Sequence, residues 1–313
     1  MVKIEVKIRL VEYSNIVDLI GALQPCILAQ PGDSVQIELD LRCESDFIYT
    51  EKLLVIACLL SDLRRKGVHV LGFINAHWDG NAAKYASRIN FFQHIDLKLS
   101  ETFQRHENQG RFVEITPYDK DSIYQTHIQL NSVLSRHNWI HPDVLRLLYY
   151  CMYEVLDNVL NHSAMLHGWV CAQLFRRSDE IRIVIADTGR GMHQALTSNP
   201  KYADVNEGEA LLLCIQRGIT AGNGLGFGLF ATSEFIRRNQ GDLLIYSGNH
   251  FLHHSEHETL VEQGQIWRGT LVYLRICTNV PVDYNQIMPP GHTLPDDYQE
   301  FLDKYIGPHN ELW

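Results

Sequence analysis

Residues 154–162 read EVLDNVLNH, residues 187–192 read DTGRGM and residues 222–229 read GNGLGFGL. The first stretch lies in a predicted helix that begins at Pro142, because apolar residues recur there at three- and four-residue steps: Leu145, Leu148, Met152, Val155 and Val159. The second stretch follows the apolar run IRIVIA, a predicted strand, and the third runs into a helix expected to start near Phe227.

Three polar side chains follow one face of the long predicted helix. Glu154, Asn158 and His162 are four residues apart, which aligns them beside the apolar stripe. The amide oxygen of Asn158 can coordinate Mg²⁺, and the carboxylate of Glu154 can hold or deprotonate a water molecule. Taken alone, this spacing is also typical of a solvated helix face.

The DTGRGM stretch places a carboxylate at the end of a predicted strand. Asp187 can accept a hydrogen bond from the exocyclic amine of adenine. Gly189 and Gly191 would let the backbone approach the base, and Met192 offers an apolar surface to the ring. A plain glycine turn after a strand is the alternative.

The GNGLGFGL stretch exposes backbone N–H groups at the start of a predicted helix. These donors and the helix dipole favour a phosphate chain. The stretch is not a dinucleotide-binding fingerprint, because no parallel βαβ unit with the glycines after its first strand can be drawn here. It is not a P-loop either, because no Gly-Lys-Ser/Thr follows.

The order and spacing of these stretches resemble the GHKL superfamily, which includes gyrase, heat-shock chaperone, histidine kinase and MutL ATPases. EVLDNVLNH resembles its N box, DTGRGM its first glycine box and GNGLGFGL its second. The Gly-Thr of GTLVYLRI, from Gly269, resembles its closing strand motif. The resemblance implies a Bergerat fold over residues 112–280, an α/β sandwich in which helices cover one face of a mixed sheet.

The resemblance implies ATP as ligand and Mg²⁺ as its cofactor. Asn158 would be the Mg²⁺ ligand, Asp187 the adenine-reading residue and Thr270 a supporting hydrogen-bonding residue. Gly189, Gly191 and Met192 would border the base. The second glycine box would cradle the phosphates: Gly222, Asn223, Gly224, Leu225, Gly226, Phe227, Gly228 and Leu229. Residues 193–222 would form a lid, with Arg217 as a candidate phosphate contact.

The resemblance leaves the reaction open, because hydrolysing and anti-sigma-type kinase members share this N-box pattern. We expect slow ATP hydrolysis in which Glu154 orients water, and lid closure that changes a protein-protein surface. One alternative is a serine/threonine kinase of a partner-switching system, with Glu154 as base for a protein hydroxyl. The other is a nucleotide-gated interaction module that does not hydrolyse ATP.

The first hundred residues predict a separate α/β domain. Strands are expected near 2–10, 35–41 and 68–74, and helices near 14–24, 50–66 and 82–94. This order is similar to the STAS fold of anti-sigma antagonists, whose phosphorylatable Asp-Ser-Ser-Gly is missing here; Tyr49 and Thr50 stand nearest to its position. We expect a STAS-like domain at 1–100, the ATP-binding domain at 112–280 and a C-terminal tail at 281–313.

The composition of the chain limits the classes of partner and the cellular location that we expect. The formal net charge of −10 leaves no basic excess for nucleic acid. The longest apolar run, Leu53 to Leu60, is too short to cross a bilayer, and MVKIEVKIRL is not a signal peptide. Seven cysteines without a Cys-x-x-Cys pair predict buried thiols. We therefore expect a cytoplasmic protein that binds ATP or ADP, a regulatory protein and, as is common in the family, a second copy of itself.

Histidines cluster in the segment NHFLHHSEHE: His250, His253, His254 and His257. The segment is polar and lies between two predicted strands, so we interpret it as a solvated hairpin insertion. A zinc or nickel site is the alternative. His127 and His137, in or near the helix expected over 121–136, are interpreted as surface or core residues, so a typical sensor histidine kinase is disfavoured.

Overall fold

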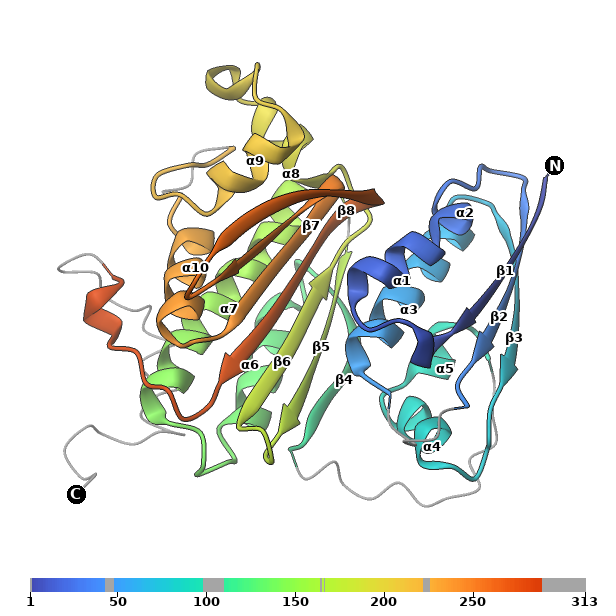
Figure 1. Ribbon diagram of the computed structural model, residues 1–313, viewed down its shortest axis with the longest axis horizontal. Helices are drawn as coiled ribbons and strands as arrows, with labels where there is room; N and C mark the ends of the chain where they lie inside the picture. Colours follow the sequence, from blue (N-terminus) through green and yellow to red (C-terminus); the bar gives the residue numbers. More distant parts are fainter. Residues whose placement is uncertain are drawn as a thin grey trace.

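The computed structural model describes residues 2–42, 48–97, 110–163, 165, 167–221 and 226–288. The described chain contains a three-stranded sheet from the N-terminal part and a five-stranded sheet from the C-terminal part. Figure 1 shows helices of the N-terminal part between the two sheets, and further helices on the far face of the five-stranded sheet. The molecule is therefore layered as sheet, helices, sheet and helices.

The N-terminal sheet is parallel, with the strand order β1-β2-β3. Its elements are β1 (Lys3–Arg9), η1 (Leu10–Glu12), α1 (Ile16–Ala22), α2 (Gln24–Ile27), β2 (Ser34–Asp40), α3 (Thr50–Arg65), β3 (His69–Asn75), α4 (Asn81–Arg88) and α5 (Phe91–His94). Val35, Ile37 and Leu39 of β2 are buried and alternate with half-buried residues, as in a strand with one well-covered face. The helix expected near 82–94 is interrupted at Asn90, whose φ of 64° is left-handed.

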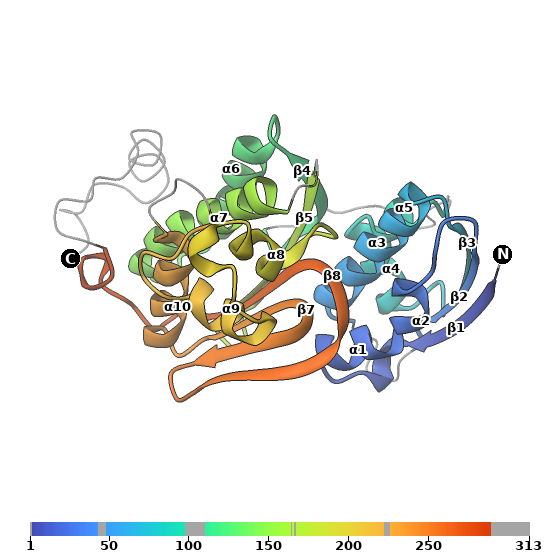
Figure 2. The same ribbon diagram turned by 90° about the horizontal axis from the view of Figure 1, so that it is seen from above.

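Helix α3 is buried on nearly all sides. No residue from Leu53 to Leu60 is more than 3% exposed. A helix that is apolar all round must be covered all round, and Figures 1 and 2 show α3 between the two sheets. The longest apolar run is thus an internal helix. None of the helices that the structure describes has both the length and the apolar composition needed to cross a membrane.

The five-stranded sheet has the order β4-β5-β6-β8-β7. The elements of this part are β4 (Phe112–Asp119), α6 (Ile123–Leu134), α7 (Pro142–His162), β5 (His167–Phe175), β6 (Glu180–Ala186), α8 (Gly191–Thr197), η2 (Pro200–Tyr202), α9 (Glu207–Cys214), α10 (Gly228–Arg238), β7 (Asp242–Ser255), β8 (Thr259–Cys277) and η3 (Tyr284–Gln286). The described part of the chain past β8 packs on this unit through Val282, Ile287 and Met288.

The α/β architecture agrees with the expected sandwich, but the expected mixed sheet is wrong in detail. Each pairing among the five described strands is antiparallel. The crossover through α8, α9 and α10 delivers β7 in the same direction as β6, and β8 then returns as a hairpin into the position between them. The two parallel strands are therefore not neighbours.

Strands β7 and β8 are longer than the sequence indicates. We expected a strand near 242–247, a polar insertion and a strand from 269. Instead β7 and β8 continue through the polar segment as one hairpin, with a register shift beside Gly248. Gly248 has a φ of 65°, and this bulge lets the hairpin extend beyond the rest of the sheet.

Both faces of the five-stranded sheet are buried. In β5, Val170 and Ala172 pack in the core with α7 and α10, whereas Trp169 and Cys171 pack in the core of the N-terminal helices. Strand β6 alternates in the same way, which explains why its residues read as a continuous apolar run. The N-terminal part therefore serves as the second cover of this sheet.

Candidate functional site

Asp187 follows directly after β6 and is only 1% exposed. One carboxylate oxygen accepts a hydrogen bond from the backbone N–H of Gly189 at 2.7 Å, and the other accepts from the backbone N–H of Thr270 at 3.2 Å. Burial raises the pKa of Asp187 to about 7, although these two hydrogen bonds oppose the shift. Thr270 thus holds Asp187 through its backbone.

Glycines beside Asp187 allow close backbone approaches. A Cβ atom at Gly189 would collide with the carbonyl oxygen of Ser163, the residue just after α7. Gly191 has a φ of 78°, and a Cβ there would lie 2.6 Å from the hydroxyl oxygen of Ser247. The N–H of Arg190 donates to the Ser163 carbonyl at 2.9 Å. The turn is therefore joined to the end of α7, and its glycines allow close contact with protein atoms; their predicted approach to a base stays a prediction.

Two side chains that the motifs do not include complete this turn. Ser247 accepts a hydrogen bond from the N–H of Met192 and donates one to the carbonyl of Gly269, each at 2.8 Å. Trp267 donates through its indole N–H to the backbone carbonyl of Asp187 at 3.1 Å. The sequence motifs do not predict a role for Ser247 or Trp267, because the positions of these two residues depend on how β7 and β8 pair. The Met192 side chain packs partly buried against the α7 core.

Glu154 and Asn158 lie one turn apart on α7, and both are half-buried. Burial raises the pKa of Glu154, while a hydrogen bond with Tyr150 opposes the shift. A Cβ at Gly228, the first residue of α10, would collide with the Glu154 carboxylate. The Asn158 side chain forms no hydrogen bond with any described residue, which leaves its amide oxygen available to a ligand. The His162 side chain lies outside the described part.

The second glycine box is described only from Gly226 onward; Gly222, Asn223, Gly224 and Leu225 lie outside the described residues. The Gly226 carbonyl accepts a hydrogen bond from the N–H of Gly218 at 2.8 Å. Phe227 precedes α10, and its side chain and that of Leu229 pack on the core. Their contribution to a phosphate site can therefore come only from their backbone. Arg217 lies over the Phe227 ring, 5.8 Å from its centroid.

The expected lid region contains α8, η2 and α9. Leu196, Tyr202 and Ala210 form a small core of their own. Helix α9 packs on the extended hairpin, as Figure 2 shows. There Glu207 accepts a hydrogen bond from the N–H of Asn249 at 2.9 Å, and its carboxylate lies 3.1 Å from His250. This region therefore rests on the part of the sheet that the sequence did not predict.

The histidine-rich segment forms the outer part of this hairpin, which agrees with the hairpin interpretation, but the segment is not fully solvated, because His254 is only 6% exposed. His253 lies 3.4 Å from Asp242, and His254 forms a hydrogen bond with the hydroxyl of Thr259 at 2.7 Å. Over the described ranges, no group of three or more His, Cys, Asp or Glu side chains is arranged to hold a metal ion. His127 is 1% exposed and bonded to the Tyr149 carbonyl, as expected of a core residue.

The N-terminal part contacts the turn after Asp187 directly. Thr188 donates through its hydroxyl to Asp62 of α3 at 3.0 Å. Asp62 also pairs with Arg65 and Lys66 on the same helix, so its carboxylate is held in place. Near the start of α3, Thr50 donates to the side-chain oxygen of Gln173 in β5 at 3.0 Å. Helix α3 thus contacts the five-stranded sheet near both of its ends.

Comparison with known families identifies this unit. Residues 143–277 match the family described as histidine kinase-, DNA gyrase B-, and HSP90-like ATPase. This part of the chain is therefore a domain of the GHKL superfamily, an ATP-binding module with an α/β sandwich fold. The range contains Glu154, Asn158, Asp187 and Thr270, and it excludes the whole N-terminal part. The resemblance of residues 1–100 to STAS domains stays a prediction. No curated protein matches the chain significantly.

Proposed function

We propose that the chain binds Mg·ATP and hydrolyses it slowly, and that the state of the nucleotide regulates a protein-protein interaction. The observation that carries this proposal is the position of Glu154. Its half-buried carboxylate lies against Gly228 at the N-terminus of α10, where the phosphates of a bound nucleotide are expected. A carboxylate in that position can orient a water molecule toward the last phosphate.

The described donor set fits this ligand. Asp187 would offer carboxylate oxygens to the exocyclic amine of adenine, in a turn whose glycines pack closely on Ser163 and Ser247. Asn158 would hold Mg²⁺ through its amide oxygen, which is a suitable ligand atom and has no described partner. Mg²⁺, when bound, neutralises phosphate charge. The raised pKa of Glu154 brings this base closer to neutral pH, which favours proton transfer.

Two contacts support a regulatory output. The lid region rests on the β7–β8 hairpin through Glu207, and the adenine-side turn contacts α3 through Thr188 and Asp62. A nucleotide that moves the lid would change the surface presented beside α9, and one that moves the turn would bias the docking of the N-terminal part. We propose a regulatory protein or a second copy of the chain as the partner of that surface.

The geometry disfavours Thr50 as a phosphate acceptor within one chain. Thr50 is 1% exposed and bonded to Gln173, so its hydroxyl cannot reach a nucleotide unless the two parts separate. A kinase would therefore need a different acceptor, in this chain or in another protein. A non-hydrolysing module remains the other alternative, and it differs from an ATPase in requiring no function from Glu154.

The test is incubation of the purified protein with γ-labelled ATP and Mg²⁺, in which free phosphate and protein-bound label are counted together. We expect free phosphate from the wild type, and a rate about 10²–10⁴-fold lower for Glu154→Gln with nucleotide binding retained. Glu262→Gln, a change at an exposed glutamate of the hairpin, is the matched control. Label retained on the protein would favour the kinase, and neither product would favour the non-hydrolysing module.

The magnesium assignment has its own test. Asn158→Ala should abolish the Mg²⁺-dependent part of ATP binding, because it removes the amide oxygen proposed to bind Mg²⁺. Binding is compared with and without Mg²⁺ by calorimetry. Asn161→Ala, at an exposed position of the same helix, should leave binding unchanged. Normal Mg·ATP binding by Asn158→Ala would show that the site is assigned to the wrong residue.

A further inference from the structure

A second cavity lies at the opposite end of the five-stranded sheet from Asp187. Its volume is about 810 Å³, and it is lined by Arg111, His137, Trp139, Leu174, Phe175, Arg176, Arg177 and Ser178. Strand β6 begins two residues after Ser178 of the cavity and ends just before Asp187. Its seven residues therefore separate the two sites by about 20 Å. The cavity is therefore distinct from the nucleotide site.

Three segments far apart in the sequence form the walls. The N–H of Leu174 in β5 donates to the carbonyl of Arg111 at 2.9 Å. His137, in the connection between α6 and α7, donates through Nε2 to the carbonyl of Gly110 at 2.7 Å. Gly110 has a φ of 72°, and a Cβ there would lie 2.9 Å from His137 Nε2. Hydrogen bonds thus join the walls into one structure.

The cavity concentrates uncompensated positive charge. Arg111, Arg176 and Arg177 are exposed, and no described residue forms an ion pair with any of the three. The nearest acid along the chain, Asp179, accepts a hydrogen bond from the side chain of Asn279 at 3.4 Å, and the next, Glu180, lies beside Arg182 and Arg275. Within the described ranges these three guanidinium groups form a local basic cluster on a chain whose net charge is −10. Such a local excess attracts an anion.

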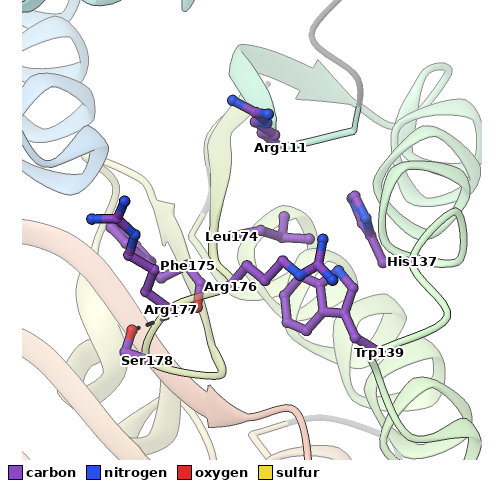
Figure 3. Close-up of a pocket in the computed structure, with 8 residues that line it drawn as sticks. All are labelled: Arg111, His137, Trp139, Leu174, Phe175, Arg176, Arg177 and Ser178. Atoms are coloured by element: carbon purple, nitrogen blue, oxygen red, sulfur yellow. Dashed lines mark hydrogen bonds between the residues drawn. The ribbon is translucent and has the colours of Figure 1, made fainter.

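The shape of the cavity indicates which class of anion it can bind. Figure 3 shows Arg176 extending toward Trp139, with His137 on that side, Arg111 above the hairpin and Arg177 turned to the other side. The rings of Trp139 and His137 lie 5.4 Å apart, which provides a partly apolar wall. Guanidinium groups bind phosphate oxygens in pairs, and an aromatic wall accepts an organic group attached to the phosphate.

We propose that this cavity binds a phosphate monoester, with Arg111 and Arg176 on the phosphate and Trp139 against its organic part. The three arginines line one cavity on a chain whose net charge is −10, so a single phosphate group fits better than a nucleic-acid backbone. The monoester is either a free small molecule or a phosphorylated side chain of another protein. The chemistry of recognition is the same for both.

The probe is phenyl phosphate, titrated by calorimetry into the full chain in the presence of saturating Mg²⁺ and a non-hydrolysable ATP analogue, which occupies the nucleotide site. We expect saturable binding by the wild type, and affinity about tenfold lower for Arg111→Gln and for Arg176→Gln. Arg136→Gln, at an exposed arginine outside the cavity, should bind like the wild type. Phenol should not bind.

Absence of saturable binding would overturn the proposal. So would an equal loss in Arg136→Gln, which would indicate a general charge effect, or equal binding of phenol. A phosphotyrosine peptide distinguishes the two sources. Binding of the peptide at least as tight as that of phenyl phosphate supports a protein-borne phosphate, and binding of phenyl phosphate alone supports a free small molecule.

Discussion

The two ends of the five-stranded sheet are built in opposite ways. At the Asp187 end the backbone fills the space: Gly189 has no room for a Cβ atom, and both oxygens of Asp187 accept backbone N–H groups. At the other end, exposed arginine side chains surround an open cavity. Close packing of backbone atoms determines the shape of the first end, whereas the positive charge of exposed side chains determines what the second end can bind.

This difference decides what each end can tolerate. A site made of close backbone approaches fails when one methyl group is added, because no neighbour can move aside. A site made of long exposed side chains loses affinity in steps, one charge at a time. Helix α3 contacts the sheet near both ends, through Thr50 and Asp62, so it is the element through which either end could affect the other.

Gly189→Ala should have the largest effect on stability. The added Cβ overlaps the carbonyl oxygen of Ser163, a backbone atom, so we expect a loss of about 1–3 kcal/mol in the free energy of unfolding, together with loss of ATP binding. Denaturant unfolding measures the first quantity. Gly72→Ala in β3 is the control, because its Cβ would meet no atom within 4 Å. Equal stability of the two variants would contradict the close approach.

The next effect is a pH dependence from Asp187. Its pKa rises from 3.8 to about 7 on folding, so the folded state holds this proton more tightly than the unfolded state. The stability that this proton contributes is complete below pH 4 and is lost as the pH rises toward 7, by at most about 1.4 kcal/mol per pH unit. The difference in unfolding free energy between the wild type and Asp187→Asn should therefore vary with pH over this window. A constant difference would contradict the raised pKa.

A smaller effect is expected where α3 meets the turn. Thr188→Val removes the hydroxyl that donates to Asp62 and keeps the shape of the side chain, so it should cost about 1 kcal/mol of unfolding free energy. If nucleotide binding and domain docking are coupled, ATP affinity should also change. Thr197→Val, which removes a hydroxyl bonded within α8, controls for the loss of a local hydrogen bond. No change in either quantity would show that the contact carries no coupling.

The smallest effect separates the two ends. Arg176→Gln should leave the affinity for Mg·ATP unchanged, because the cavity lies about 20 Å from Asp187 along β6. Calorimetry with ATP gives the comparison. A loss of ATP affinity in this variant would mean either that the two sites communicate or that ATP binds in the basic cavity, and titration of phenyl phosphate against bound ATP would separate these cases.

The sequence correctly predicted the strand that leads to Asp187 and the long helix α7, and for a physical reason. A strand that ends in an acid, followed by glycines, admits few backbone paths, and the four-residue spacing of Glu154 and Asn158 fixes their shared helix face. The structure joins the first glycine turn to the end of α7 and brings α10 against Glu154. The site roles of these residues still await the experiments above.

Other features depended on pairings that local pattern does not encode. Ser247 and Trp267 reach the turn only because β7 and β8 pair with a register shift at Gly248. The sheet is antiparallel because β8 inserts between the two parallel strands β6 and β7. The apolar residues on all sides of α3 predict that the helix is buried, but they do not predict which element covers it. The basic cavity joins residues from three segments that share no motif.

The central claim is that the Asp187 carboxylate accepts a hydrogen bond from the adenine of bound ATP. A titration of Mg·ATP into the wild type and Asp187→Asn tests this claim most directly. An asparagine there must turn its NH₂ group toward one of the two N–H donors that now face carboxylate oxygens, and it loses the charged acceptor for adenine. We predict ATP binding by the wild type and affinity about 10–100-fold lower for the variant, with its fold intact. Equal affinity in the two proteins would contradict the account.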